Sequence, residues 1–437
     1  MIIAKRLKGK AIATWLGPTG DAARRAFGNL KERISKAPRR LDFYYDIADP
    51  WSYLTAQAVS RLLAAYPVDF AFHSITPPAS DVDPAPVLRP KYAARDAIQL
   101  CEYWDLEFPA KKEPDSTMVK DFAAAMIRER PPTEQLKASL ELGHSLWTTD
   151  KKSMVQLLGT WGQESSGEVA PILNTAYSEL RKAGHYQGAM LHYNNEWYWG
   201  VDRLPYLEDA LAKDLGVPVQ HVVKVRPEAE RGPLKLSEKP LTAELWFSFR
   251  SPYSYLALEQ IEAVLAPYQV PLTLRPVLPM VTRGLPMPSV KRMYIVRDAK
   301  READRLHIPF GELCDPLGTG VDRCIAIAKW AGERSQADLL RFSKSAMRGI
   351  WAEARDVSEY VDLRYVVERA ELPWEEAKAA IADAAAATKW AQANATDLLV
   401  YGLWGVPSVK VGDFVAWGQD RLPLLADRLR RHHADRP

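Results

Sequence analysis

A serine hydroxyl at the junction of a predicted strand and a predicted helix is the group in this chain best placed for chemistry. From Glu244 to Arg250, apolar and polar residues alternate with the two-residue period of a sheet strand. Ser251 then suits a helix N-cap, and Pro252 suits the first helical turn. Free backbone N–H groups and the positive end of the helix dipole would face any group at Ser251. The stretch therefore predicts a site for a phosphate, a carboxylate or a thiolate.

The cysteines and histidines point away from metal and disulfide chemistry. Cys101, Cys314 and Cys324 form no C-x-x-C pair, and the eight histidines include no H-x-x-x-H pair. We therefore expect no catalytic metal and no structural disulfide. Cys314 and Cys324 are expected to be packing residues. His432 and His433 are expected to lie in a polar C-terminal tail without a specific role.

Length and composition indicate an ordinary globular protein of more than one domain. The 437 residues exceed one typical domain, and the chain is 47% hydrophobic and 26% charged. A net charge of +3 without a long basic stripe argues against nucleic acid as a partner. No apolar run reaches the roughly 18 residues of a membrane helix. We expect a cytoplasmic protein without a membrane partner.

The chain repeats itself. Residues 45–54 resemble residues 248–256, and both stretches follow an alternating strand and precede a helix. Three further landmarks recur in the same order: Tyr92 with Asp96 and Tyr294 with Asp298, Trp147 and Trp351, and residues 199–205 and 417–423. Four landmarks in one order at a nearly constant offset predict a tandem duplication.

The repeats set the expected domain boundaries. We predict an N-terminal helical extension over residues 1–40, a first domain over 41–215, a linker over 216–240 and a second domain over 241–430. The extension has a helical pattern around residues 21–35. The linker is rich in proline, valine and charge, and is expected to lie on the surface.

Both repeats predict the same order of elements. A strand and a helix are followed by a second strand, at residues 68–75 or 271–278, and then by a long helical section. A β-hairpin comes next, with its turn at residues 194–195 or 412–413, and a last helix ends the repeat. Periodicity alone does not fix how these strands pair.

The second repeat resembles the 2-hydroxychromene-2-carboxylate isomerases and the kappa-class glutathione transferases. The motifs that carry the resemblance are residues 249–255, Arg275-Pro276, Lys291 with Tyr294, Asp298 and Arg301, residues 405–407, and residues 417–422. The resemblance implies an α/β fold of two tandem thioredoxin-like (DsbA-like) domains, each with a helical insertion. Residues 251–254 stand where redox thioredoxins carry C-x-x-C, so disulfide exchange is not expected.

The resemblance also implies a glutathione site in the second repeat. Ser251 would hydrogen-bond the thiolate of glutathione. The other implied contacts are Val406 and cis-Pro407 to the peptide part, Gln419 and Asp420 to the γ-glutamyl end, and Lys291 to the glycyl carboxylate or a substrate carboxylate. A helix N-terminus and hydrogen-bond donors lower a thiol pKa from about 8.5, which makes thiolate available at neutral pH.

The implied activity is glutathione-dependent isomerisation of a small, electrophilic, aromatic-derived compound. In an isomerase the thiolate would add to a conjugated system, allow a bond to rotate and then leave. A kappa-type transferase, which would stop at the adduct, is one alternative, and a non-catalytic glutathione- or peptide-binding module is another. The homodimers of both families suggest that the two domains form a pseudo-dimer within one chain, and a further homodimer stays open.

Two departures from the family pattern stand out. The loop at residues 284–289 lacks the asparagine that the family often carries there, which weakens the isomerase interpretation in particular. In the first repeat, Asp49 stands where Ser251 stands, and residues 188–190 replace residues 405–407. A carboxylate beside a thiolate raises the thiol pKa. We therefore predict that the first repeat is inactive in glutathione chemistry, with Asp49 as a catalytic acid the less favoured reading.

Structural interpretations compete with each of these roles. Ser251 could be a helix cap only, and Asp420 could cap the final helix. Lys291, Tyr294 and Asp298 share one helix face, where a surface salt bridge and a ligand contact are equally open.

Overall fold

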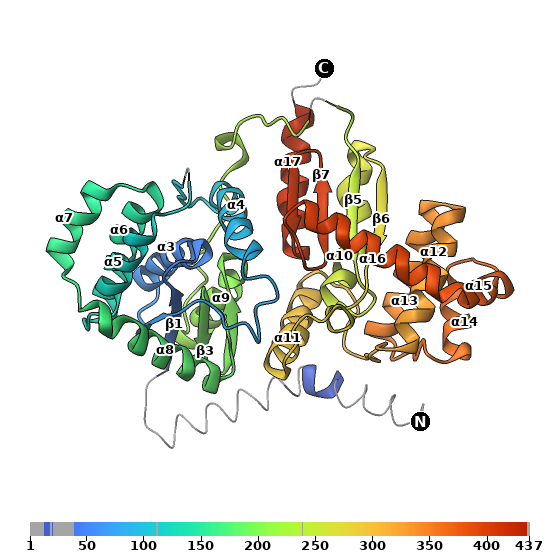
Figure 1. Ribbon diagram of the computed structural model, residues 1–437, viewed down its shortest axis with the longest axis horizontal. Coiled ribbons are helices and arrows are strands. Elements are labelled where there is room, and N and C mark those ends of the chain that lie inside the picture. The colour runs from blue at the N-terminus through green and yellow to red at the C-terminus, as the bar shows by residue number, and fades with distance from the viewer. Residues whose placement is uncertain (1–12, 18–19, 21–38, 111, 238, 435–437) are drawn as a thin grey trace. The chain divides into compact units, whose positions relative to one another are not determined.

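The computed structural model of the protein describes residues 13–17, 20, 39–110, 112–237 and 239–434. The chain forms two compact units, and the boundary between them falls after Arg231, inside the predicted linker. We call residues 39–231 the N-terminal unit and residues 232–434, together with residues 13–17 and 20, the C-terminal unit (Figure 1). The helix expected around residues 21–35 lies outside the described residues. None of the described helices is long and apolar enough to span a membrane.

The N-terminal unit contains a four-stranded sheet of order β2-β1-β3-β4. Its elements are β1 (Arg40–Asp46), α3 (Pro50–Ala65), β2 (Asp69–Ile75), α4 (Leu88–Tyr103), α5 (Ser116–Met126), α6 (Pro132–Thr148), α7 (Lys151–Trp161), α8 (Ser166–Ala183), β3 (Met190–Tyr193), β4 (Glu196–Trp199), η1 (Val201–Arg203), α9 (Leu204–Leu215) and η2 (Glu228–Glu230). β1 pairs with β2 in parallel, and the other two pairings are antiparallel.

The C-terminal unit repeats this plan with the sheet order β6-β5-β7-β8. Its elements are β5 (Ala243–Phe247), α10 (Pro252–Leu265), η3 (Ala266–Tyr268), β6 (Leu272–Pro276), η4 (Met280–Arg283), α11 (Ser289–Arg305), α12 (Thr319–Arg334), α13 (Gln336–Ala352), α14 (Tyr360–Arg369), α15 (Trp374–Ala380), η5 (Ile381–Asp383), α16 (Ala384–Val400), β7 (Ser408–Val411), β8 (Phe414–Trp417), η6 (Gln419–Arg421) and α17 (Leu422–Ala434). The pairing of β5 with β6 is parallel, and the other two are antiparallel.

Alternation along β5 places its side chains on two faces of the sheet. The indole of Trp246 is buried against α16 and donates its N–H to the backbone carbonyl of Asn394 at 2.9 Å. The Asn394 side chain in turn donates to the carbonyl of Pro276 at the end of β6, also at 2.9 Å. These two bonds hold α16 across strands β5 and β6 (Figure 1).

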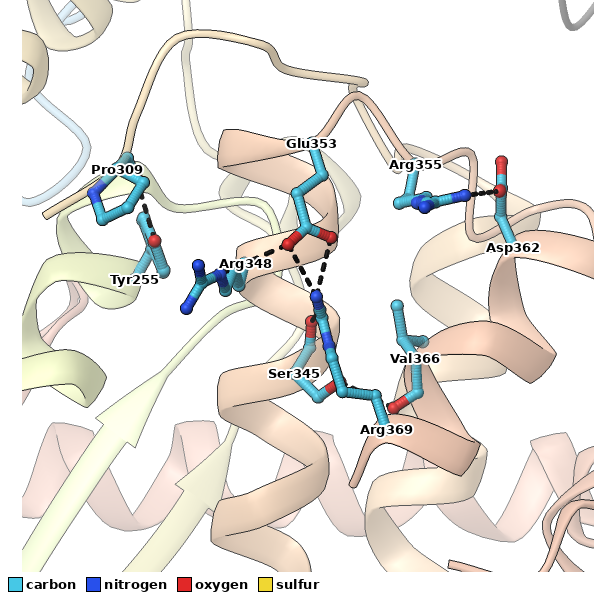
Figure 2. Close-up of polar contacts among 9 residues, drawn as sticks. All are labelled: Tyr255, Pro309, Ser345, Arg348, Glu353, Arg355, Asp362, Val366 and Arg369. Carbon is cyan, nitrogen blue, oxygen red and sulfur yellow. Dashed lines mark hydrogen bonds and ion pairs between the residues drawn. The ribbon is translucent and has the colours of Figure 1, made fainter. Parts of the chain in front are cut away.

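The helical section of the C-terminal unit is joined by ion pairs between α13 and α14. Figure 2 shows the Glu353 carboxylate between two arginines. Arg369 Nη1 lies 2.6 Å and 2.8 Å from its two oxygens, and Arg348 Nε lies 3.2 Å from one of them. Arg369 also donates to the hydroxyl and the backbone carbonyl of Ser345 at 2.9 Å and 2.6 Å. The pairs fix α14 against the end of α13.

Both hairpins turn where the sequence predicts. Asn194 and Asn195 adopt left-handed φ values of 49° and 61° between β3 and β4, as asparagine tolerates in a two-residue turn. Gly412, with φ of 55°, begins the turn between β7 and β8.

The expectation of a polar tail around His432 is wrong. Helix α17 continues to Ala434, and the His432 side chain is buried. Its Nδ1 accepts the backbone N–H of Leu236 at 3.1 Å. This role could not be predicted from local sequence, because Leu236 is distant along the chain. In addition, an arginine-rich helix end is typical of a solvent-exposed position.

The strand registers correct one alignment between the two repeats. Trp199 pairs with Met190 and Trp417 pairs with Ser408, so Met190 and Ser408 are equivalent. Residues 188 and 189 therefore correspond to residues 406 and 407. The sequence comparison aligned them with residues 405 and 406 instead. Matching glycine to glycine caused the error, because register is set by strand pairing and not by residue type.

Candidate functional site

Ser251 is the N-cap of α10, immediately after β5. Its Oγ accepts the backbone N–H of Ser254 at 3.2 Å, as a serine cap is expected to do. The hydroxyl also donates to the backbone carbonyl of Val406 at 3.4 Å, which is long for an O–H donor. The side chain is partly exposed. Ser251 thus combines a committed acceptor with a weakly held donor at a helix N-terminus.

Val406 and Pro407 lie beside this hydroxyl although they are distant in sequence. The peptide bond between them is cis, as the resemblance implies. The Pro407 carbonyl accepts the N–H of Gly418 at 2.9 Å, which leads the chain directly into η6. The structure therefore brings Ser251, Val406 and the start of the 418–421 turn into one region of the C-terminal unit.

A tyrosine of the same motif joins α10 to α11. Tyr253 donates its hydroxyl to Asp298 Oδ2 at 2.7 Å, and Arg301 Nη1 lies 3.4 Å from the other carboxylate oxygen. The Asp298 side chain is buried. The alternative of a surface salt bridge at this position is therefore wrong, because Asp298 is an internal link between two helices.

The corresponding link exists in the N-terminal unit. Trp51, two residues after Asp49, donates its indole N–H to Asp96 Oδ2 at 2.8 Å, and Tyr92 donates to Oδ1 at 3.1 Å. In each unit the aspartate of the landmark pair thus accepts a hydrogen bond from an aromatic side chain of the first helix, Trp51 or Tyr253.

Lys291 lies in the first turn of α11 and is partly exposed. It precedes Asp298 by seven residues, so the two share a helix face and are separated by roughly 10 Å along the axis. That face meets Tyr253 of the 251–254 motif. Contact of Lys291 with a carboxylate of a ligand stays a prediction.

Gln419 is buried and already bonded on both sides of its amide. Its Nε2 donates to Glu302 Oε2 at 2.6 Å, and its Oε1 accepts from Gln260 Nε2 at 3.2 Å. The buried Glu302 comes from α11 and Gln260 from α10, so this amide links three elements. These bonds fix the orientation of the Gln419 amide and leave it one N–H donor and one acceptor lone pair.

Asp420 lies in the 3-10 turn η6 and forms an ion pair with Arg421 at 3.3 Å. The Arg421 side chain is almost fully buried, and its carboxylate partner is slightly more exposed. Burial of Arg421 indicates a structural role for that arginine, because a buried guanidinium requires a partner.

Arg250, directly before Ser251, is held by an ion pair. Its Nε and Nη2 donate to the two oxygens of Asp315 at 2.7 Å and 2.8 Å. Burial alone would raise the pKa of Asp315, but this bidentate bond outweighs it and keeps the pKa below its usual value. The positive charge of Arg250, beside Ser251, is thus balanced by the carboxylate of Asp315.

The equivalent region of the N-terminal unit is closed by its own hydrogen bonds. Asp49 caps α3 and accepts the backbone N–H and the hydroxyl of Ser52 at 3.0 Å and 2.9 Å. The Ser52 hydroxyl accepts N–H groups from Asp46 at 3.1 Å and from Ala189 at 2.8 Å. Ala189 occupies the place of Pro407, which has no N–H to give. A side chain on Gly188 would collide with Asp46, so the backbone fills this space.

The same region holds two buried carboxyl groups, those of Asp46 and Asp49. Only Asp49 was singled out from the sequence. Burial and the nearby Asp49 carboxyl raise the pKa of Asp46 to about 7, although Arg89 opposes the shift. Burial also raises the pKa of Asp49. Arg89 itself forms an ion pair with Asp83 at 2.7 Å. The sequence signal for this pair of carboxyl groups was the presence of two aspartates, Asp46 and Asp49, three residues apart at a strand–helix junction.

The three cysteines are not paired with one another. Cys314 and Cys324 are buried, as expected of packing residues, and all three cysteines are free thiols. Burial raises the pKa of Cys324 and of Cys101, which disfavours a reactive thiolate. Among the described residues, no cluster of histidine, cysteine and carboxylate side chains could hold a metal ion.

Comparison with known proteins identifies the C-terminal unit. Residues 242–430 match the family model of the DSBA-like thioredoxin domain. Solved structures that resemble the chain include a 2-hydroxychromene-2-carboxylate isomerase, at 24% identity, covering 44% of this chain and 98% of that one with a TM-score of 0.38. A probable DsbA oxidoreductase from Streptomyces coelicolor matches at 19% identity, with 45% and 92% covered and a TM-score of 0.36. No curated protein matches the chain.

Proposed function

We propose that this chain, whose residues 242–430 form a DSBA-like thioredoxin domain, is a glutathione-dependent isomerase of the 2-hydroxychromene-2-carboxylate isomerase type. Its substrate would be a small electrophilic compound derived from an aromatic ring. One observation carries the proposal. The Ser251 hydroxyl stands at the N-terminus of α10, 3.4 Å from the carbonyl that precedes cis-Pro407.

The hydrogen-bond state of Ser251 suits a thiolate. The helix cap uses a lone pair of Oγ, and the O–H has only a long bond to Val406. Turning this O–H to a sulfur anion would cost little and would place it where the helix dipole also favours negative charge. Bound glutathione would supply the nucleophilic thiol. Ser251 would hold it as thiolate by lowering its pKa.

The remaining residues fit glutathione in part. The backbone of Val406 is beside the hydroxyl, where it could pair with the peptide. Asp420 is the more exposed of the two residues expected at the γ-glutamyl end, and its carboxylate suits the ammonium there. Gln419 is engaged by Glu302 and Gln260. We propose that Gln419 contributes mainly by fixing the turn that carries Asp420.

The N-terminal unit is proposed to be a degenerate second copy. Its sheet has the same strand order as the other, which supports duplication. The Asp49 carboxylate and the internal bonds of Ser52 support the view that this copy does not bind a thiolate. One glutathione per chain is therefore expected. The pseudo-dimer and the cytoplasmic location stay predictions.

Calorimetric titration of glutathione tests the proposal. The wild type is expected to bind about one equivalent of glutathione per chain. Of the two helix caps Ser251 and Asp49, Ser251 is the one with a hydroxyl that can donate to a thiolate. Ser251→Gly removes the hydroxyl donor, keeps most of the stability of the helix cap, and should weaken binding about tenfold or more. Asp49→Ala changes the equivalent cap of the other unit and should leave binding unchanged. Absence of binding by the wild type at millimolar glutathione would reduce Ser251 to a helix cap.

Kinetic assays separate the alternatives. An isomerase regenerates free glutathione with each turnover, whereas a kappa-type transferase consumes it as a conjugate. Chromene and enone substrates should therefore be screened for product formation together with the loss of free thiol. Binding without turnover would favour the non-catalytic module. Insulin reduction should be absent, because no cysteine pair occupies the start of α10.

A further inference from the structure

An arginine near the proposed site has no acidic partner within the part of the chain that the structure describes. Arg283 ends the 3-10 helix η4, which follows β6. Its Nη1 donates to the backbone carbonyl of Trp404 at 3.2 Å. Among the described residues, no carboxylate forms an ion pair with it, and burial lowers its pKa without a compensating anion. A guanidinium has five N–H donors, and partly buried cations are normally paired.

The position of Arg283 relative to Ser251 follows from one short stretch of backbone. Trp404, which Arg283 contacts, is two residues before Val406, which accepts the Ser251 hydroxyl. Two extended residues span at most roughly 7 Å. The guanidinium and the hydroxyl therefore lie at neighbouring points of the same loop.

An acid lies near the opposite end of this loop, on a segment beyond the β7–β8 hairpin. The carbonyl of cis-Pro407 accepts the N–H of Gly418, two residues before Asp420. A ligand extended along Val406 would thus meet a guanidinium at one end and a carboxylate at the other. The nearby Arg250 is neutralised by Asp315, so it does not compete for an anion.

We propose that Arg283 binds the glycyl carboxylate of glutathione, which leaves the substrate carboxylate as the group for Lys291. This inference rests on the proposed function. The polarity of the ligand matches that of the loop: the γ-glutamyl end has an ammonium group that suits Asp420, and the glycyl end has only a carboxylate. A guanidinium recognises a carboxylate through paired N–H donors, and Arg283 has donors to spare.

Titrations with glutathione and with its glycyl ethyl ester test the inference. Esterification removes the charge that Arg283 would bind, so the wild type should bind the ester about tenfold or more weakly than glutathione. Arg283→Gln should weaken glutathione binding by a similar factor and leave ester binding unchanged. Arg283→Lys, which keeps the charge, should recover part of the loss. Melting temperatures of the variants check that they fold.

Arg292→Gln is the matched control, because it removes an exposed guanidinium from the first turn of α11. It should leave binding of both ligands unchanged. Wild-type binding of glutathione that Arg283→Gln does not weaken, or equal wild-type affinities for acid and ester, would overturn the inference alone. No binding of glutathione by the wild type would remove the proposed function and this inference with it.

Discussion

At the N-terminus of the first helix, one unit carries a hydroxyl and the other a carboxylate. Both cap the helix, because each offers an oxygen to the N–H three residues later. Ser251 retains a donor that can serve an anion, whereas an ionised Asp49 can only accept and repels one. A change of one side chain therefore preserves the fold and alters the chemistry available at this position.

The buried carboxyl of Asp46 predicts a pH dependence of stability. Its pKa rises from 3.8 to about 7 in the folded protein. Between these values the folded state holds a proton that the unfolded state has released, so stability falls as pH rises and levels off above about 7. Asp46→Asn does not titrate and should gain stability relative to the wild type over this range, on the order of 4 kcal/mol in total.

Urea unfolding of both proteins between about pH 4 and pH 8 measures this difference. Asp49, Asp83 and Arg89 are the charged groups that act on Asp46. Asp69→Asn, an exposed carboxyl in the same unit, is the control and should show no such trend. A gap between wild type and Asp46→Asn that stays constant with pH would contradict the prediction.

Among the elements, α13 and α14 depend on a carboxylate between two arginines. Glu353→Gln would leave Arg369 and Arg348 without their counter-charge (Figure 2). Because these side chains are partly buried, the cost should exceed that of an exposed pair, at about 1–2 kcal/mol. Thermal unfolding measures it.

Glu368→Gln is the matched control for this change. Glu368 pairs with Arg364 four residues away on the exposed face of α14. Removal of that pair should cost clearly less than Glu353→Gln, because both of its side chains are exposed to water. Equal effects of the two substitutions would show that Glu353 contributes no more than a surface pair.

The whole chain is two units joined by a segment that is anchored at both ends. On the N-terminal side, Glu208 accepts the backbone N–H groups of Val222 and Val223 at 2.9 Å and 3.4 Å. On the other side, Leu236 is buried and bonded to His432. The residues between are mostly exposed, so the surface linker that composition predicts is confined to the middle of the segment.

An insertion in this exposed middle should be tolerated. A protease recognition sequence between Pro233 and Leu234, after the Gly232 carbonyl that Arg431 holds, should leave the melting temperature unchanged, and cleavage there should not abolish glutathione binding, because the proposed site lies within one unit. The same insertion between Asn194 and Asn195 interrupts a tight hairpin turn and should lower the melting temperature. Unfolding upon cleavage of the linker would contradict this prediction.

The sequence by itself determined the features that depend on neighbouring residues. Helix caps such as Ser251 and Asp49, the hairpin turns and the order of strands and helices could all be predicted, because capping and periodicity act over a few residues. The repeated landmarks also anticipated the equal strand order of the two sheets.

Only the tertiary structure decided which distant groups meet. Arg283 contacts the carbonyl of Trp404, 121 residues later, and Gln419 is bonded to Glu302, 117 residues earlier. Asp298 is buried where a surface position was equally open, and the register of β3 moved its alignment by one residue. Local patterns cannot specify such contacts, because they arise from the pairing of strands and the packing of helices across the whole unit.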